Sequence, residues 1–73
     1  MTIDIEKLQS DPRTDPRLTE YQRGRASAKY DAEHAVDELV DLLKFPYLAD
    51  VLGAEWARGY REFGNAWLIV NQA

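Results

Sequence analysis

Two aromatic-x-x-glycine patterns, one in each half of the chain, constrain the fold most. Tyr21 precedes Gly24 by three positions in the first half, and Trp56 precedes Gly59 by three positions in the second. On an α-helix, this spacing places a ring one turn away from a patch of bare backbone. Two such patches can face each other and allow two helices to pack closely. We therefore predict a helix pair that meets at Gly24 and Gly59, with Trp56, Tyr60 and Tyr21 at the contact.

Helical periodicity covers the first half of the chain after its N-terminal arm. From Pro16 to about Lys44, apolar residues recur at spacings of three and four, as on one face of a helix. Asp15 followed by Pro16 is typical of a helix start, so the first helix is expected to begin there. A polar stretch near residue 30, where Asp31 could cap a new helix, interrupts the apolar stripe. One bent helix and two abutting helices both fit, and we favour a break near residue 30.

The second half repeats the helical pattern after a proline. Phe45 is expected to end the first segment, because a residue before proline is pushed out of the helical region. Pro46 can then open the next helix. Gly64 and Asn65 are expected to stop that helix, and residues 66–70 would form a short final helix or an apolar tail. No alternation typical of strands is present, so the fold class is predicted to be all-α, built on a helical hairpin.

Chain length indicates one small domain. With 73 residues, the chain buries a modest core and gains from close packing or association. We divide it into an N-terminal arm, residues 1–15, and a single helical domain, residues 16–73. The arm is expected to be a short helical turn or an extended segment docked by Ile3 and Ile5. Residues 67–70 are more apolar than one short helix can bury alone, so self-association as a homodimer is a further prediction.

Three features that the sequence lacks predict the cellular location of the chain. It has no cysteine, which fits a reducing compartment. Its N-terminus lacks the basic and apolar regions of a signal peptide. No apolar run approaches the roughly 18 residues of a membrane span. A cytoplasmic location, without a membrane partner, is therefore expected.

Negative charge is concentrated in the middle of the chain. The net charge is −4, and residues 31–55 hold most of the acidic side chains with one lysine. Such a surface repels phosphate, which makes nucleic-acid binding over the whole surface an unfavourable reading. Glu33, Asp37 and Asp41 repeat at a spacing of four, and Glu38 lies beside them. We call these four residues the acidic face. It is either ordinary solvated surface or a negative face that meets a basic partner.

Arginines offer an alternative binding surface. Arg23, Arg25, Arg58 and Arg61 would gather on one side if the two helices packed antiparallel. Together they would form a patch for phosphate or for an acidic partner. Pairing with neighbouring glutamates at a solvated face is the favoured explanation, and such surface pairs contribute only about 0–1 kcal/mol each.

The same choice applies to the aromatic residues of the glycine patterns. Their simplest role is core packing, because burial of one large side chain contributes about 1.5–3 kcal/mol. An exposed aromatic platform for a base or for a partner loop is the alternative.

Catalytic and metal-binding patterns are not found in the sequence. His34 is the only histidine, and a pairing with Glu38 is too common to indicate a metal site. There is no nucleophile with an accompanying base and no glycine-rich phosphate loop. We expect neither an enzyme nor a cofactor.

Several motifs together resemble the ribosome modulation factor family and its small bacterial and phage relatives. The resemblance covers residues 20–63. Its motifs are Tyr21-Gln22-Arg23-Gly24, Pro46-Tyr47 and the run Trp56-Ala57-Arg58-Gly59-Tyr60-Arg61-Glu62. It implies a scaffold of packed helices and, from the best-known members, binding to the small ribosomal subunit. This chain has a longer and more acidic segment between Gly24 and Pro46, and it carries Tyr60 where the family often has tryptophan. The scaffold is therefore expected to be shared, and the ribosome-binding surface is not.

From these observations we predict a small regulatory protein that occupies the surface of a macromolecular partner. The acidic face would bind a basic protein. Two alternatives stay open. One is a ribosome or RNA binder that uses the arginines, as the family resemblance implies. The other is a phage-encoded inhibitor whose acidic residues imitate the charge of a nucleic acid and block a host defence or DNA-binding protein.

Overall fold

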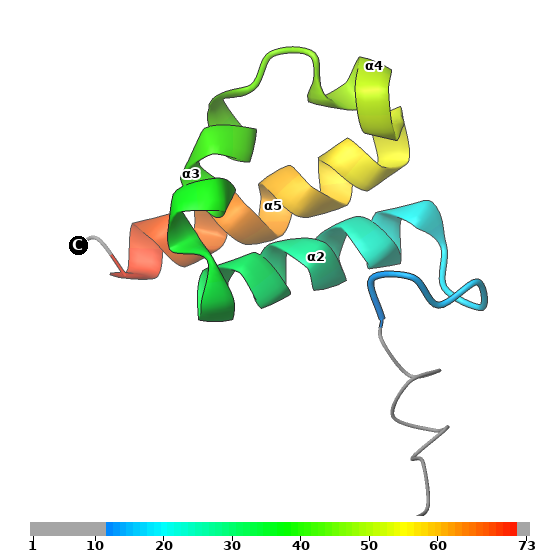
Figure 1. The fold of residues 1–73 in the computed structure, drawn as a ribbon, viewed down its shortest axis with the longest axis horizontal. Helices are drawn as coiled ribbons and strands as arrows, with labels where there is room; N and C mark the ends of the chain where they lie inside the picture. The colour runs from blue at the N-terminus through cyan, green and yellow to red at the C-terminus, as the bar shows by residue number, and fades with distance from the viewer. Residues whose placement is uncertain (1–11, 72–73) are drawn as a thin grey trace, which may run out of the picture.

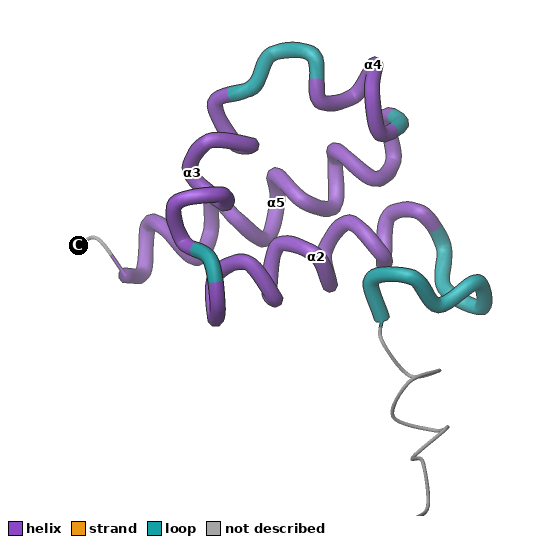
Figure 2. Tube along the Cα trace, in the orientation of Figure 1, coloured by secondary structure: helices purple, strands orange, loops and turns teal. Residues whose placement is uncertain are grey.

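The fold is all-α, as the sequence predicts. The structure, a computed structural model, describes residues 12–71, and within that range it contains helices and no strand. The helices, shown in Figures 1 and 2, are α2 (Glu20–His34), α3 (Val36–Lys44), α4 (Leu48–Leu52) and α5 (Ala54–Asn71). The expected docking of Ile3 and Ile5 falls outside the described residues.

The two long helices lie side by side and run in the same direction. In Figure 1, α2 passes from cyan to green and α5 from yellow to red, both from right to left. The intervening segment, α3 and α4, returns the chain to the starting end above them. The prediction of a helical hairpin is therefore wrong in this respect. The glycine-notched helices are not consecutive, and the α3–α4 segment between them makes a parallel pair possible.

Two glycines set the distance between α2 and α5. A Cβ atom on Gly24 would overlap the carbonyl oxygen of Trp56 and lie 2.8 Å from the carbonyl carbon of that residue. A Cβ on Gly59 would likewise overlap the carbonyl oxygen of Tyr21 and lie 3.0 Å from the Tyr21 carbonyl carbon. Each glycine thus accepts the backbone of the opposite helix. The predicted contact through Gly24 and Gly59 is confirmed.

Helix α2 begins later than the sequence predicts. Thr19, not Asp15, is its N-cap. The Thr19 hydroxyl accepts a hydrogen bond from the Gln22 backbone N–H, and the Gln22 side chain accepts one from the Thr19 N–H. This reciprocal capping box satisfies two backbone donors at the helix start. Asp15 instead caps a separate turn by accepting the backbone N–H of Arg17 at 2.9 Å. Two capping residues lie close together in the sequence, and the box selects the second.

The break between the first two helices lies at Ala35 rather than near residue 30. Ala35 has an extended φ of −151°, and its N–H donates to the carbonyl of Asp31. Asp31 does not cap a helix, because its carboxylate accepts a hydrogen bond from the hydroxyl of Tyr60 on α5 at 2.5 Å. A side chain held by a distant helix is unavailable as a local cap. The long-range contact therefore explains why the sequence prediction was wrong at this point.

The α3–α4 connection follows the expected proline rule. Helix α3 ends at Lys44, and Phe45 before the proline has the extended ψ of 113°. Helix α4 begins at Leu48 with Tyr47 as its N-cap, so the expectation that Pro46 opens this helix is wrong by two positions. Gly53 then separates α4 from α5 with a φ of 100°, a left-handed conformation that favours glycine. This turn redirects the chain so that α5 can pass back beneath α3 and α4.

The sequence predicts a helix stop at Gly64. In the structure, Gly64 is instead a third point of contact between helices. Helix α5 continues through Gly64 to Asn71, and Gly64 is buried. A Cβ at this position would lie 2.9 Å from a methyl group of Leu43 and 3.1 Å from one of Leu39. The leucines of α3 therefore pack where a side chain would otherwise be. Because side chains of a neighbouring helix fill the space beside Gly64, the hydrogen bonds of α5 continue through this position.

The core of the described domain is small. Its buried hydrophobic residues are Ala28, Ala32, Leu39, Leu48, Ala57 and Tyr60. Half of these are alanines, which permit close approach but bury little apolar area. The larger Trp56, Phe63 and Trp67 pack against this core while remaining partly exposed. The Trp56 and Tyr60 rings stack with centroids 5.0 Å apart, which fits the predicted packing role of these aromatic residues.

Candidate functional site

The acidic face spans two helices rather than one. Glu33 lies near the end of α2, whereas Asp37, Glu38 and Asp41 lie on α3. The predicted single row is therefore divided by the break at Ala35. The three α3 residues share one side of the helix, since positions separated by three or four residues are neighbours on its surface. All four acidic side chains are exposed.

Packing of the opposite side of α3 orients these carboxylates. Leu39 is fully buried, and Leu43 contacts the notch at Gly64. Because the leucines point at α5, Asp37 and Asp41 lie on the outer side of α3, and Glu38 lies at its flank, where its charge still acts on Tyr60 of α5. Asp37 and Glu38 also lie in the first turn of α3, whose N-cap makes no side-chain hydrogen bond. Negative charge there stabilises the exposed N–H groups of the helix start. Asp41, beyond that turn, has no such structural role.

The α3 carboxylates form no ion pair with residues 12–71. Glu33 has a partner, the imidazole of His34 at 3.9 Å, and this contact is an ion pair only when His34 is protonated. The free carboxylates of Asp37, Glu38 and Asp41 therefore face solvent and keep their charge available for a partner.

The four arginines of the alternative patch do not gather. Arg23 extends from α2 to the preceding turn, where its guanidinium donates to the carbonyls of Asp15 and Leu18 at 3.2 and 2.6 Å. Arg61 donates to the Phe45 carbonyl at 3.2 Å and so holds the α3–α4 connection against α5. Both side chains thus bind the backbone of the protein itself. Only Arg25 and Arg58 come together.

Arg25 and Arg58 meet at the ring of Tyr21. The Arg58 guanidinium lies over this ring, 4.3 Å from its centroid, and the Tyr21 hydroxyl accepts a hydrogen bond from Arg25 at 3.3 Å. The same hydroxyl donates to Glu62 at 3.2 Å. Arg58 also forms ion pairs with Glu55 at 2.7 Å and Glu62 at 3.3 Å. These contacts, first of all the hydrogen bond to Glu55, raise the pKa of the Arg58 guanidinium.

Arg25 differs from the other three arginines in having no carboxylate or carbonyl partner among residues 12–71. Its guanidinium contacts only aromatic groups, since it lies 5.8 Å from the centroids of both Tyr21 and Phe63 and bonds to the tyrosine hydroxyl. Sequence reasoning grouped it with the others by charge. The structure separates Arg25 from Arg23, Arg58 and Arg61, whose guanidinium groups bind carbonyls or carboxylates.

Two further titratable groups have shifted pKa values for structural reasons. Burial raises the pKa of the Tyr60 hydroxyl, and its hydrogen bond to Asp31 adds to this effect. At the N-terminal turn, the hydrogen bond from the Arg17 side chain lowers the pKa of Asp15. The Tyr60 hydroxyl joins α5 to α2, and the Asp15 carboxylate holds a local turn through Arg17.

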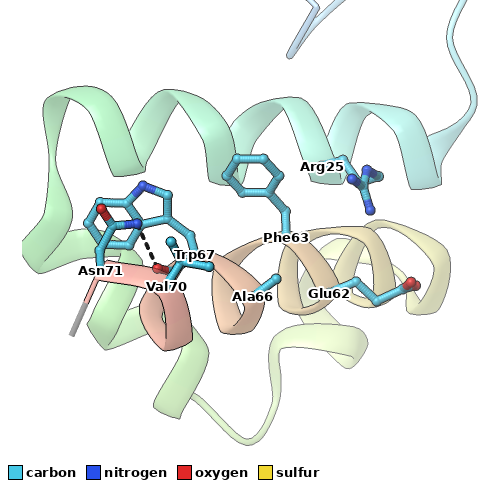
Figure 3. Close-up of a pocket in the computed structure, with 7 residues that line it drawn as sticks. All are labelled: Arg25, Glu62, Phe63, Ala66, Trp67, Val70 and Asn71. Carbon is cyan, nitrogen blue, oxygen red and sulfur yellow. Dashed lines mark hydrogen bonds between the residues drawn. The ribbon is translucent and has the colours of Figure 1, made fainter. Parts of the chain in front are cut away.

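An apolar groove between α2 and the C-terminal half of α5 was not predicted from the sequence. Phe63, Ala66, Trp67 and Val70 form its floor, with a volume of about 330 Å³. Figure 3 shows Arg25 and Glu62 at one end of the groove and Asn71 at the other, where the Asn71 amide donates to the Trp67 carbonyl at 2.8 Å. The predicted stop at Gly64 concealed this groove, because it cut α5 before the apolar residues could be read as one helical stripe.

Neither a cluster of metal ligands nor a membrane-spanning helix is present in the described part of the chain. Within residues 12–71, no three histidine, aspartate or glutamate side chains gather closely enough to hold a metal ion. None of the helices formed by these residues combines the length and apolarity needed to cross a lipid bilayer.

Comparison with family models, with curated proteins and with solved structures finds no match to this chain. The resemblance to the ribosome modulation factor family therefore stays a prediction that rests on the motifs alone. The contacts of the described residues are the basis for assigning a role to the two surfaces.

Proposed function

We propose that this chain is a non-enzymatic binding protein whose acidic face occupies a basic surface of a protein partner. The observation that carries the proposal is the exposed group of carboxylates on α3, which have no ion-pair partner among residues 12–71. Helix α3 is held from behind by Leu39 and Leu43, so these charges are presented on a fixed element. Fixed, unpaired charges of one sign steer an oppositely charged partner and select against partners of like charge.

The positions of the arginines support an acidic rather than a basic binding surface. Arg23 and Arg61 bind backbone carbonyls, and Arg58 binds Glu55 and Glu62. A phosphate ligand would have to compete with each of these internal acceptors. The carboxylates of Asp37, Glu38 and Asp41 would lose no internal ion pair on meeting a partner. The cost of rearrangement therefore favours the acidic face.

Charge reversal on α3 tests the proposal against a matched change on α4. Asp41→Lys and Asp50→Lys alter the net charge equally, and both residues are exposed. The tagged protein is used to capture partners from cell lysate at low and high salt. We expect Asp41→Lys, and more strongly Asp37→Lys with Asp41→Lys, to abolish a salt-sensitive capture that Asp50→Lys retains. Full capture by the double variant would contradict the proposal.

The identity and behaviour of the captured material separate the remaining alternatives. Co-sedimentation with ribosomes that falls steeply with salt, and that is lost on Arg25→Glu but kept in the Asp37 and Asp41 variants, would replace the acidic face with the arginines. A captured protein that DNA or RNA displaces would instead support imitation of nucleic-acid charge by the acidic face. A captured basic protein that nucleic acid leaves bound supports the proposal in its simplest form.

A further inference from the structure

The C-terminal half of α5 carries a stripe of apolar residues that α2 only partly covers. Along α5, apolar residues alternate at spacings of four and three: Trp56, Tyr60, Phe63, Trp67 and Val70. This is the spacing of a helix that buries one seam against a neighbour. In the first half Tyr60 is fully buried and Trp56 is half-buried. In the second half the seam opens into the groove described above.

Exposure rises toward the end of the stripe. Phe63 and Trp67 are half-buried, whereas Val70 is 76% exposed and the adjacent Ile69 is 73% exposed. These are the most exposed large hydrophobic side chains of residues 12–71. The core of the domain is small and half alanine, and a chain of this size gains stability from association. Covering the stripe would add the large apolar residues that the core lacks.

The charges at the groove suit a second copy of the same chain. Arg25 and Glu62 lie at the same end of the groove (Figure 3), and Arg25 has no carboxylate partner within the described part of its own chain. In a twofold contact each residue meets the same surface on the other copy, so residue i contacts residue j and j contacts i. If the axis runs along α5, the charged end of one groove meets the charged end of the other.

We infer that two copies of this chain associate about a twofold axis parallel to α5. Phe63, Trp67 and Val70 form the seam, and Arg25 of each copy pairs with Glu62 of its partner. This orientation supplies the carboxylate that Arg25 lacks. An antiparallel contact would place Arg25 near Asn71 and leave its charge unpaired. The contact uses α2 and α5, so it does not depend on the function proposed for the acidic face of α3.

Sedimentation of the full chain over a range of concentrations tests the association. Val70→Glu and Val51→Glu form a matched pair, since both valines are largely exposed, at 76% and 66%, and Val51 lies on α4. We expect wild-type protein to form dimers. Val70→Glu should weaken the dimer about tenfold or more, because it places a charge in an apolar seam. Val51→Glu should leave the dissociation constant unchanged. Circular dichroism checks that each variant keeps its helices.

Charge reversal tests the pairing and the direction of the axis. Arg25→Glu alone and Glu62→Arg alone each place like charges opposite one another and should weaken self-association about tenfold. An equal mixture of these two variants restores both pairs and should form dimers with nearly wild-type affinity. Failure of the mixture to associate would overturn the proposed orientation.

Two results would overturn association through the groove. One is wild-type protein that remains monomeric at about 1 mM, the weak end of specific affinities. The other is an apolar dye that binds in the groove while the protein keeps its dimeric mass in sedimentation. A groove buried at the dimer contact would not be free to hold the dye.

Discussion

The α2–α5 contact and the contact of the α3–α4 segment with α5 are packed by opposite means. Where α2 crosses α5, Gly24 and Gly59 bring one backbone against another. Where α3 meets α5, leucine side chains fill the space beside Gly64. A backbone contact has no rotamers with which to adapt, whereas leucine methyl groups can move by a few tenths of an ångström. The first contact is therefore rigid and intolerant of change, and the second is adjustable.

This difference bears on function, because the two contacts hold different surfaces. The rigid α2–α5 pair forms the groove and positions Arg25 and Glu62. The adjustable contact holds α3, which carries Asp37 and Asp41 outward. Changes of stability in one region should therefore be separable from changes of binding in the other.

The largest expected effect comes from adding one methyl group at the backbone contact. Gly59→Ala, or Gly24→Ala, forces α2 and α5 apart, because the new Cβ overlaps a carbonyl oxygen that cannot move alone. We expect a loss of about 4 kcal/mol or complete unfolding, above the usual cost of overpacking. Urea denaturation followed by circular dichroism measures it.

Gly64→Ala is the control that sharpens the comparison. Its Cβ meets the ends of the Leu43 side chain, which can rotate away, and alanine favours the helix by about 1 kcal/mol over glycine. We expect a stability within about 1 kcal/mol of wild type. Equal losses for Gly59→Ala and Gly64→Ala would show that the two contacts do not differ as described.

An intermediate loss of stability is expected for a change in the α3–α4 segment. Leu39 is fully buried between α3 and α5, so Leu39→Ala removes apolar contacts and leaves a cavity. We expect a loss of about 3 kcal/mol, since a small, adjustable site can partly collapse. Amide hydrogen exchange should rise first in α3 and later in α2 and α5. Uniform exchange across all helices would indicate that the α3–α4 segment and the α2–α5 pair unfold as one unit.

A smaller loss than that of Leu39→Ala concerns the hydrogen bond that joins α5 to the end of α2. Tyr60→Phe removes the donor to Asp31 and should cost about 1.5 kcal/mol, as expected for a hydrogen bond to a charged acceptor that water can still reach. Thermal unfolding near neutral pH measures this loss. The phenylalanine keeps the stacking on Trp56, which limits the effect to the hydroxyl.

The same variant carries a pH signature. The pKa of Tyr60 in the folded protein is raised above the ordinary value of 10.0. Its contribution to stability is therefore fully present below pH 10.0 and is lost as the pH rises through the raised value. Wild-type stability should fall more steeply than that of Tyr60→Phe in alkaline solution. Parallel curves for the two proteins would exclude Tyr60 as the cause.

Much of the helical content could be predicted from local sequence, and the errors share one physical cause. Local sequence favours a start of α2 at Asp15 and Pro16, whereas the capping box at Thr19 and Gln22 begins the helix. Local sequence favours a break near residue 30 with Asp31 as a cap, but Asp31 is instead bonded to Tyr60. In each case two local solutions were available, and a contact or a reciprocal cap chose between them.

The candidate surfaces show the same division. The sequence identified the acidic face by its charges, but it could not show that Glu33 lies on a different helix from Asp37. It grouped four arginines that the structure separates according to their partners. The sequence does not predict the groove, because Gly64 is a typical helix stop. In the structure, leucines from α3 fill the space beside Gly64. Local patterns carry no information about which distant side chain will fill a gap.

The sequence by itself determined that the chain is helical, that Gly24 and Gly59 bring two helices together, and that negative charge gathers in the middle third. These properties follow from periodicity, from the absence of a side chain and from composition, which are local quantities. Tertiary structure alone decided that the paired helices run parallel, which charges remain unpaired and whether a glycine ends a helix or receives a neighbour. Each of those outcomes depends on a partner far away in the sequence, and the free energy of that contact exceeds the weak local preference that it overrides.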